Sequence, residues 1–132
     1  MYYLIDTHTL IWAITDISKL YKKGRDLLES EENSVYVSSV CFWEIVLKFS
    51  LGKLELKGII PSQMPALAKN HGFEFLPLSP EDAATYNQLP LTSHKDTFDR
   101  MLIWQAIRQN LIVVTKDPQF EHYQDQGLKV VW

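Results

Sequence analysis

Apolar runs rich in β-branched and aromatic residues alternate along this chain with segments of helical spacing, and this alternation constrains the fold most. Strands separated by helices need crossover connections, so we expect a mostly parallel sheet covered by helices on both faces. Leu111–Val114 supports this expectation because it is apolar on both faces of a strand. The predicted strands are Tyr2–Asp6, Val35–Ser38, Phe73–Leu76, Leu111–Thr115 and Leu128–Trp132.

Capping signals place the helices between these strands. Ser79 precedes Pro80, Glu81 and Asp82, which combines a capping side chain, a proline in the first turn and acids at the positive helix end. Gly72 can end the helix before it in a left-handed conformation. Helices are therefore predicted over Thr7–Ile14, from Ser18 through Leu28, over Ser39–Leu51 and Pro61–Asn70, from Ser79 onward, and over Thr97–Gln109.

Length and composition fit one domain spanning residues 1–132, with 46% hydrophobic and 22% charged residues and no internal repeat or linker. No segment approaches the roughly 20 apolar residues that cross a membrane, and the first residues do not form an export signal. The one cysteine, Cys41, lies in an apolar run and is interpreted as a small buried side chain. We therefore expect a cytoplasmic protein.

The net charge of −3 does not suggest a nucleic-acid-binding protein, which usually carries a basic surface. The chain has 16 acidic and 13 basic side chains. If four acids bound divalent cations, the remaining acids and the basic residues would nearly balance. The overall charge therefore neither excludes RNA nor argues for it.

Asp6 and Asp117 follow predicted strands, and the carboxyl ends of parallel strands lie at one edge of a sheet. Binding sites in such sheets form beyond this edge. Asp6 ends the first strand, and Asp117 comes two residues after the strand that ends at Thr115. Each aspartate could equally cap the helix or turn that follows it, so both interpretations stay open.

Glu44 lies on a predicted helix that is apolar around most of its circumference, on one stripe with Val40, Leu47 and Leu51. Burying a charged carboxylate costs several kcal/mol unless something compensates it. The alternative is an exposed pair with Lys48, which contributes only about 0.3–0.5 kcal/mol. A metal ligand explains this position better.

Asp99 lies in the first turn of the last long helix, on one stripe with Leu102, Ile103 and Ala106. The alternative role is a favourable interaction with the helix dipole, roughly 0.3–1 kcal/mol. Asp96, three residues earlier, could serve the same end, so one of the two could be a simple terminal charge. We prefer Asp99 as the metal ligand because it shares a helical stripe with apolar residues and should therefore face inward.

Four carboxylates brought into one pocket would repel one another and take up protons unless cations lay between them. Oxygen ligands suit Mg²⁺ or Mn²⁺ rather than zinc. His8 and His94 lie near Asp6 and Asp96, but the chain lacks the further cysteines or the spaced histidine pair that zinc sites use. The sequence therefore predicts a magnesium or manganese site.

Five stretches in order carry a resemblance to a known family. The sequence resembles the PIN-domain family, and most closely its VapC-like toxins of bacterial toxin–antitoxin pairs. Each stretch alone is weak, but their order and spacing over nearly the whole chain are specific. The stretches are Tyr3–Trp12, Val37–Ile45, Leu51–Leu54, Asp96–Ile103 and Val114–Phe120.

The resemblance implies a three-layer α/β/α sandwich and a metal-dependent endoribonuclease. It also implies a homodimer and an antitoxin protein that occupies the active site. Thr97 departs from the family, whose members commonly have proline at this helix start. The family's four acidic positions correspond to Asp6, Glu44, Asp99 and Asp117, and its supporting polar positions to Thr7, Ser38 and Thr115.

Two other classes of protein remain as alternatives. A haloacid-dehalogenase-type phosphohydrolase also has an aspartate after its first strand, but it needs a second acid where this chain has His8. A non-enzymatic PIN-fold module could bind RNA or a partner protein, although it would not need four convergent carboxylates. A nuclease acting on DNA also fits the predicted metal site.

Several other side chains near the predicted site have uncertain roles. Three basic residues flank the ligands and could contact phosphates or simply be solvated: Lys95, Arg100 and Lys116. Three aromatic side chains are interpreted as core rather than as stacking surfaces for bases: Trp12, Phe42 and Trp43.

Overall fold

The computed structural model describes residues 1–132 and contains one five-stranded sheet, in which every strand pair is parallel. The strand order is β3-β2-β1-β4-β5, so the predicted parallel sheet is confirmed. Four strands are shorter than predicted by one residue at one or both ends, and β2 begins one residue earlier than predicted. Their bounds are Tyr2–Ile5 (β1), Ser34–Ser38 (β2), Glu74–Leu76 (β3), Ile112–Val114 (β4) and Lys129–Val131 (β5).

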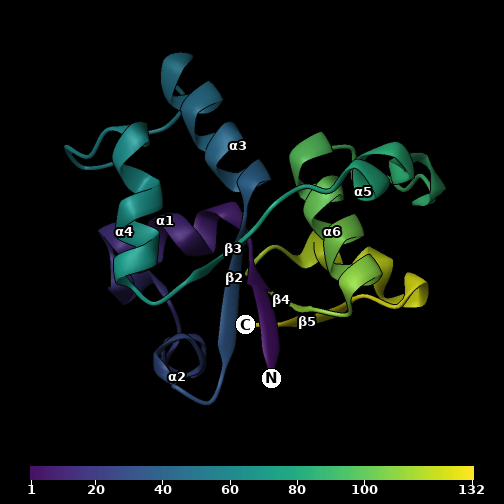
Figure 1. Ribbon diagram of the computed structural model, residues 1–132, viewed down its shortest axis with the longest axis horizontal. Helices are drawn as coiled ribbons and strands as arrows, with labels where there is room; N and C mark the ends of the chain where they lie inside the picture. Colours follow the sequence, from purple (N-terminus) through teal and green to yellow (C-terminus); the bar gives the residue numbers. More distant parts are fainter.

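Helices cover both faces of the sheet, which confirms the three-layer α/β/α sandwich. Figure 1 shows α1 and α4 on one side of the sheet and α5 and α6 on the other, while α3 contacts both α1 and α6. The α-helices are Thr7–Thr15 (α1), Lys22–Glu29 (α2), Ser39–Ser50 (α3), Met64–Asn70 (α4), Pro80–Ala84 (α5) and Thr97–Gln109 (α6). Short 3-10 helices cover Ile17–Lys19, Pro61–Gln63, Tyr86–Gln88 and Pro118–Gln126.

The central strand aligns the residues that form the site. β1 lies between β2 and β4, and Ile5 pairs with Val114 at the carboxyl ends of their strands. Both side chains are fully buried. Asp6 and Thr115 come directly after this pair, so the register places them side by side at one edge of the sheet.

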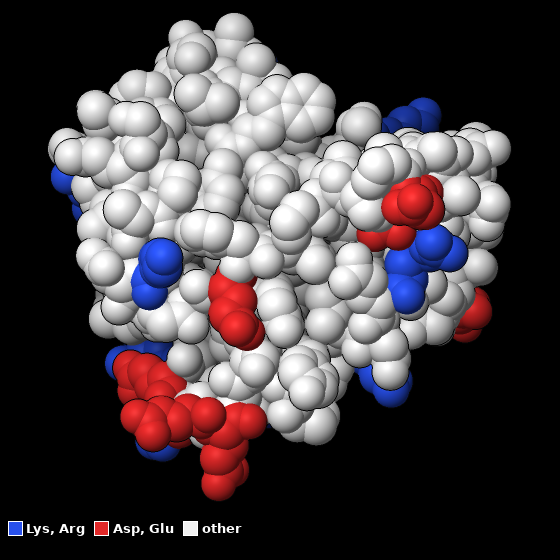
Figure 2. All heavy atoms as spheres, viewed as in Figure 1, with Lys and Arg blue, Asp and Glu red and all other residues white.

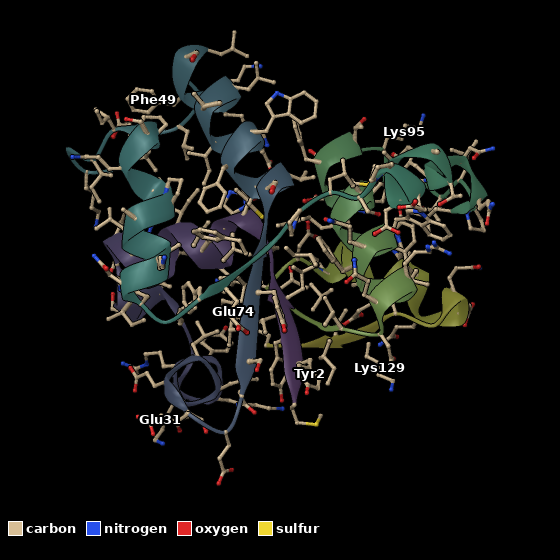
Figure 3. All side chains as sticks on the ribbon, viewed as in Figure 1. Tyr2, Glu31, Phe49, Glu74, Lys95 and Lys129 are labelled. Atoms are coloured by element: carbon tan, nitrogen blue, oxygen red, sulfur yellow. The ribbon has the colours of Figure 1, made fainter.

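One cluster of 27 buried hydrophobic residues forms the core. In Figure 3 side chains fill the space on both sides of the sheet, and Tyr2 marks its amino edge, opposite the site. Cys41 is fully buried, as predicted, and burial raises the pKa of its thiol to about 12.

The segment between α1 and β2 differs from the prediction. The expected helix from Ser18 through Leu28 is divided into the 3-10 turn Ile17–Lys19 and α2. Tyr21 has an extended backbone at the division, and Asp16 caps the 3-10 turn by accepting from the backbone N–H of Ser18. The apolar spacing correctly predicted helical structure in this segment. The cap at Asp16 and the extended backbone at Tyr21 divide it into two short elements.

The capping interactions predicted after residue 60 are present in the structure. The Ser79 hydroxyl accepts from the backbone N–H of Asp82 at 3.0 Å, although α5 is only 5 residues long. Gly72 has a left-handed φ of 85° just after α4. The predicted helix Pro61–Asn70 begins as a 3-10 turn and becomes α4 at Met64.

The surface shows one large uncharged area. In Figure 2 acidic side chains gather near α2, whereas the part over α3 is almost free of charged atoms. Trp43 on α3 is 60% exposed, which corrects its interpretation as core, while Trp12 and Phe42 are half-buried against the core. Periodicity identified the apolar faces of α3 but could not tell which of them is covered. None of the helices has the length and apolar character needed to cross a bilayer.

Candidate active site

Asp6 lies at the carboxyl end of β1 and is the first residue of the site along the chain. Its Oδ1 accepts from the backbone N–H of Thr9 at 2.9 Å and so caps α1, while its Oδ2 accepts from the Thr115 hydroxyl at 2.6 Å. The side chain is buried, and this burial raises the pKa of Asp6 above its ordinary value despite both hydrogen bonds. Asp6 is therefore both a helix cap and a buried carboxylate at the sheet edge.

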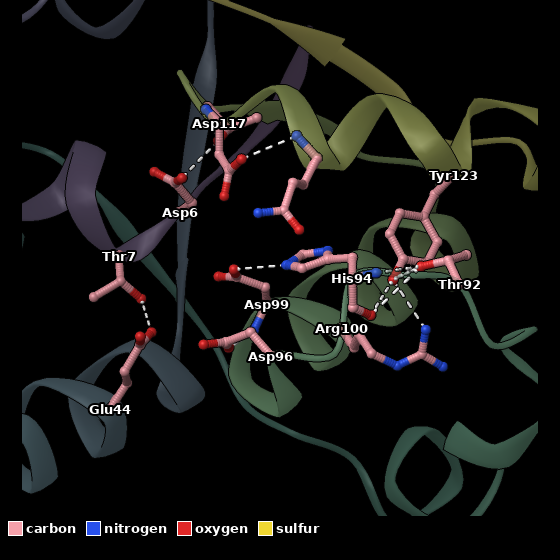
Figure 4. Close-up of polar contacts among 12 residues, drawn as sticks. Asp6, Thr7, Glu44, Thr92, His94, Asp96, Asp99, Arg100, Asp117 and Tyr123 are labelled. Atoms are coloured by element: carbon pink, nitrogen blue, oxygen red, sulfur yellow. Dashed lines mark hydrogen bonds and ion pairs between the residues drawn. The ribbon is translucent and has the colours of Figure 1, made fainter.

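Asp117 follows β4 at the same edge of the sheet. Like Asp6, it both caps a helix and contributes a carboxylate to the site. Its Oδ1 accepts from the backbone N–H of Gln119 at 2.9 Å and caps the 3-10 helix Pro118–Gln126. A carboxylate oxygen of Asp117, one of Asp99 and a ring nitrogen of His94 all lie within 4.8 Å of one another. Figure 4 shows these three side chains facing a common space with Asp6.

Asp99 enters this space from the first turn of α6. Asp96 is the cap of α6, and its Oδ1 accepts from the backbone N–H of Asp99 at 2.9 Å. Asp96 therefore has the terminal role that the sequence left open between the two aspartates. Asp99 turns inward, as its stripe predicted, and its Oδ2 lies 3.0 Å from Nε2 of His94.

The pKa of Asp99 responds to the charges of the other predicted acids. Burial raises the pKa of Asp99 to about 8, and the negative charges of four other carboxylates act in the same direction. The structure therefore brings the predicted acids close enough for their charges to act on one another. The four are Asp96, Glu44, Asp6 and Asp117.

Glu44 lies at one side of the group. It is only 2% exposed, so the burial predicted from its stripe is present. The Thr7 hydroxyl donates to Oε1, and Lys48 forms an ion pair with Oε2. Figure 4 shows Glu44 facing Thr7 from α3, apart from Asp6, Asp99 and Asp117. The Lys48 pair that the sequence offered as an alternative is therefore formed, but around a buried carboxylate.

The predicted supporting residues divide into two groups. Thr115 bonds Asp6 and also accepts from the backbone N–H of Asp117 at 3.1 Å, and Thr7 bonds Glu44. Ser38 does not bond an acid: it caps α3 and donates to Oε1 of Gln105 at 2.6 Å. Ser38 is therefore a helix cap and not a support for one of the acids.

His94 is a member of the site that the sequence did not predict. Its ring is buried, its Nε2 faces Asp99, and its Nδ1 has no hydrogen-bond partner. Burial lowers the pKa of His94. The segment is held in place because the Thr92 hydroxyl accepts from the His94 N–H, and the Tyr123 hydroxyl donates to the His94 carbonyl. The sequence placed His94 near Asp96 but could not predict its orientation, because residues 89–96 form neither helix nor strand.

Arg100 is neither solvated nor free to contact a phosphate, which corrects both roles considered for it. The side chain is buried and donates to the carbonyls of Leu89 and Pro90 and to the hydroxyls of Tyr86 and Tyr123. Its function is to hold residues 89–96, including His94, against α6.

The donor set fits a hard divalent cation. Three of the carboxylates have no ion-pair partner within 4.0 Å, although Asp6 is buried and the other two are half-buried. These three are Asp6, Asp96 and Asp117. Carboxylate oxygens are the ligands that Mg²⁺ and Mn²⁺ prefer, and such an ion would supply the positive charge that this pocket lacks.

Comparison with known proteins identifies the family. The PIN-domain family model matches residues 3–126, so the chain belongs to the PIN-domain family. Among curated proteins, none matches the sequence.

Solved structures with the same fold come from several bacteria. A chain in the structure of VapBC2 from Rickettsia felis bound to a promoter DNA fragment is 21% identical, with a TM-score of 0.69, covering 99% of this chain and 98% of that one. A chain of FitAcB from Neisseria gonorrhoeae is 21% identical, with a TM-score of 0.65 and coverages of 100% and 97%. A chain of VapBC-5 from Mycobacterium tuberculosis, described as a toxin–antitoxin system, is 18% identical, with a TM-score of 0.56 and coverages of 98% and 95%.

Proposed function

We propose that this chain is a divalent-metal-dependent endoribonuclease. The observation that carries the proposal is geometric: ligand atoms of Asp99 and Asp117 lie within 4.8 Å of each other, and Asp6 faces the same space (Figure 4). Glu44 lies at the side of this group, and its charge helps to raise the pKa of Asp99. A protein gains no stability from gathering like charges, so the arrangement is best explained by a ligand of opposite charge.

Each residue has a stated role in the proposed reaction. Asp6, Asp99 and Asp117 would hold the metal, with Asp6 as the central ligand, and Glu44 would complete the set directly or through water. Thr115 orients Asp6, and Thr7 orients Glu44. When bound, Mg²⁺ or Mn²⁺ lowers the pKa of its water and neutralises charge on the phosphoryl oxygens. Hydrolysis by water does not use the 2′-hydroxyl of RNA, so the expected products carry 5′-phosphate and 3′-hydroxyl ends.

Cleavage assays with matched variants test this proposal. Asp6→Asn and Glu44→Gln are assayed on mixed RNA and DNA while Mg²⁺ or Mn²⁺ is titrated, with Glu74→Gln as a control at an exposed acid on β3. We expect RNA cleavage to fall at least about 100-fold in the first two variants and not in the control. If both variants fold and cleave as fast as the parent, the assigned roles are wrong.

The same assay separates the rival functions. A parent that cleaves DNA in preference to RNA is a DNA nuclease. A folded parent that cleaves neither nucleic acid with either metal favours a non-enzymatic PIN-fold module that binds RNA or protein. The ion pair between Glu44 and Lys48 is the observation that keeps this second function open, because it compensates one predicted ligand without a cation.

We also propose that the protein is the toxin of a toxin–antitoxin pair and forms a homodimer in the cytoplasm as a single 132-residue domain. The resemblance of its fold to chains in VapBC structures supports an antitoxin partner. The exposed apolar face of α3 supports the dimer, because exposed apolar patches mark protein–protein contacts. This face consists of Trp43, Val46, Leu47 and Phe49. A short DNA-binding protein encoded directly upstream is the expected antitoxin, and co-purification of the two tests the pair.

A further inference from the structure

Three aromatic side chains from distant parts of the chain meet beside the carboxylates. Trp12 lies on α1, Tyr21 precedes α2, and Trp132 follows β5. The ring centroids of Trp12 and Trp132 are 6.0 Å apart, and those of Tyr21 and Trp132 are 5.6 Å apart. We refer to Trp12, Tyr21 and Trp132 as the aromatic platform.

Lysine side chains lie over the aromatic platform. The Lys116 ammonium is 5.8 Å from the ring centroid of Trp12 and 5.9 Å from that of Tyr21. The Lys19 ammonium is 5.9 Å from the Trp12 ring. Both lysines are exposed, and neither pairs with a carboxylate. In a protein with a net charge of −3, these unpaired cations form a local positive surface.

The aromatic platform is continuous with the carboxylate pocket. Lys116 directly precedes Asp117 in the chain, and one hollow of about 330 Å³ is lined both by Trp132 of the aromatic platform and by Asp117 of the carboxylate pocket. Lys23, Lys116 and Trp132 line this hollow, as do Asp117 and Glu121. A chain of phosphates leaving the carboxylate pocket through the hollow would therefore meet lysines and aromatic rings.

Packing alone does not account for the aromatic platform. Trp12 and Trp132 are half-buried, and their contact fastens the end of β5 to α1. Tyr21, however, leaves 59% of its surface exposed at the edge of the same cluster. Aromatic rings combined with a positive groove are how proteins bind single-stranded nucleic acids without sequence preference, because every base has a face that can stack.

We propose that the aromatic platform binds one unpaired nucleotide of the RNA next to the bond that is cut. The base stacks on Tyr21, and Lys19 and Lys116 contact the neighbouring phosphates. The inference rests on the proposed ribonuclease function and adds a binding surface outside the carboxylate pocket. The nucleotide that it holds is unpaired, because paired bases cannot reach an aromatic ring. This changes the interpretation of Trp12 from a core residue to part of a binding surface.

Binding without cleavage tests the role of Tyr21. The affinity of the full chain for a labelled single-stranded RNA of about ten nucleotides is measured by fluorescence anisotropy in EDTA, where metal-dependent cleavage cannot occur. We expect Tyr21→Leu to bind roughly 10-fold more weakly, and Tyr21→Phe to bind like the parent, because stacking needs the ring and not the hydroxyl.

Tyr2→Leu is the matched control. Tyr2 is 60% exposed, as Tyr21 is 59% exposed, but it lies at the opposite edge of the sheet at the start of β1 (Figure 3). Its replacement should leave RNA affinity unchanged. Equal affinities of Tyr21→Leu and the parent, or equal losses in Tyr21→Leu and Tyr2→Leu, would overturn the proposal. A surface that serves a protein partner instead would give the first of these results.

Salt dependence tests the lysines independently. Each phosphate contact to a single strand contributes about 0.7 to the slope of log affinity against log salt concentration. Lys116→Ala should lower the slope by about this amount, whereas Lys69→Ala, an exposed unpaired lysine on α4, should not. An unchanged slope in Lys116→Ala contradicts the phosphate contact.

The two proposals fail in different ways. If Asp6→Asn abolishes cleavage while Tyr21→Leu binds RNA as the parent does, the nuclease stands and the aromatic platform is wrong. If RNA binds through Tyr21 but the parent cleaves nothing with any metal, the aromatic platform stands and the nuclease is wrong.

Discussion

Asp6 and Asp117 each accept a backbone N–H at the start of a helix while their carboxylates face the same pocket. The sequence presented capping and metal binding as competing roles for these residues. They are compatible because an ionised carboxylate has about four acceptor positions, and a cap occupies one of them. Residue patterns therefore predicted where the acids would lie but could not choose between two roles that one side chain can combine.

Asp99 makes the stability of the metal-free protein depend on pH. Its pKa is about 8 in the folded protein and near 3.9 in an unfolded chain. Between these values the folded state holds a proton that the unfolded state has released, so stability falls as pH rises from about 4 to about 8. We expect a loss on the order of 2 kcal/mol between pH 5.5 and pH 8 in urea unfolding with EDTA.

Asp99→Asn is the variant that isolates this effect. The amide cannot ionise, so the pH dependence over this window should become clearly smaller, with the remainder due to the raised pKa of Asp6, and the variant should be the more stable protein at pH 8. Asp125→Asn, at an exposed acid, should keep the parent's pH dependence. The same slope in Asp99→Asn and the parent would show that Asp99 does not hold the proton.

At the scale of elements, regular periodicity and capping were predictable, and irregular segments were not. Helix α6 has the predicted bounds, Thr97–Gln109, because its apolar stripe and the signals at its two ends indicate the same segment. Residues 89–96 place His94 in the site, yet they have no periodic pattern. Their shape depends on the buried Arg100 side chain, and such a long-range anchor leaves no local signal in a sequence.

Removing the Arg100 anchor should destabilise the protein. In Arg100→Met the carbonyls of Leu89 and Pro90 lose their donors, and we expect a cost of about 3 kcal/mol in urea unfolding. Amide hydrogen exchange in residues 89–96 should increase, while β1 stays protected. Lys95→Met, at an exposed position in the same segment, serves as the control. Unchanged exchange in residues 89–96 would show that other contacts hold them.

Asn110 ends α6 in the left-handed conformation, with a φ of 56°. Asparagine tolerates this region better than residues with larger or branched side chains. Asn110→Ala should therefore lower the free energy of unfolding by about 1 kcal/mol, and Asn110→Gly should not, because glycine has no Cβ penalty there. Thermal unfolding checks this, and equal losses in both variants would contradict the conformational cause.

At the scale of the whole molecule, charge and apolar surface are distributed unevenly. Asp6 and Asp117 lie together because parallel strands end at one edge, a property of topology that the alternation of strands and helices indicated. Asp99 and Glu44 reach the same region from helices α6 and α3. Trp43 was misassigned to the core because a periodic apolar pattern is the same for a side chain that packs inside and for one that faces a second molecule. Exposure requires the three-dimensional arrangement.

The apolar face of α3 leads to a prediction about assembly. Trp43→Glu should convert the proposed dimer to a monomer in size-exclusion chromatography with light scattering, because a charge in an apolar interface must be desolvated. Leu91→Glu is the control, since Leu91 is 91% exposed and belongs to the segment between Tyr86–Gln88 and α6 rather than to α3. A parent that is already monomeric would rule out the dimer, and a dimer that survives Trp43→Glu would place the interface elsewhere.

The central claim is that the four carboxylates gather to hold a divalent cation. The most direct measurement is anomalous X-ray diffraction from crystals of the protein grown with Mn²⁺. We predict an anomalous peak at about 2.0–2.3 Å from oxygens of Asp6 and at least one of Asp99 and Asp117, with Glu44 reached directly or through water. Crystals saturated with Mn²⁺ that show no peak in this pocket, or a peak only on another surface, would contradict it.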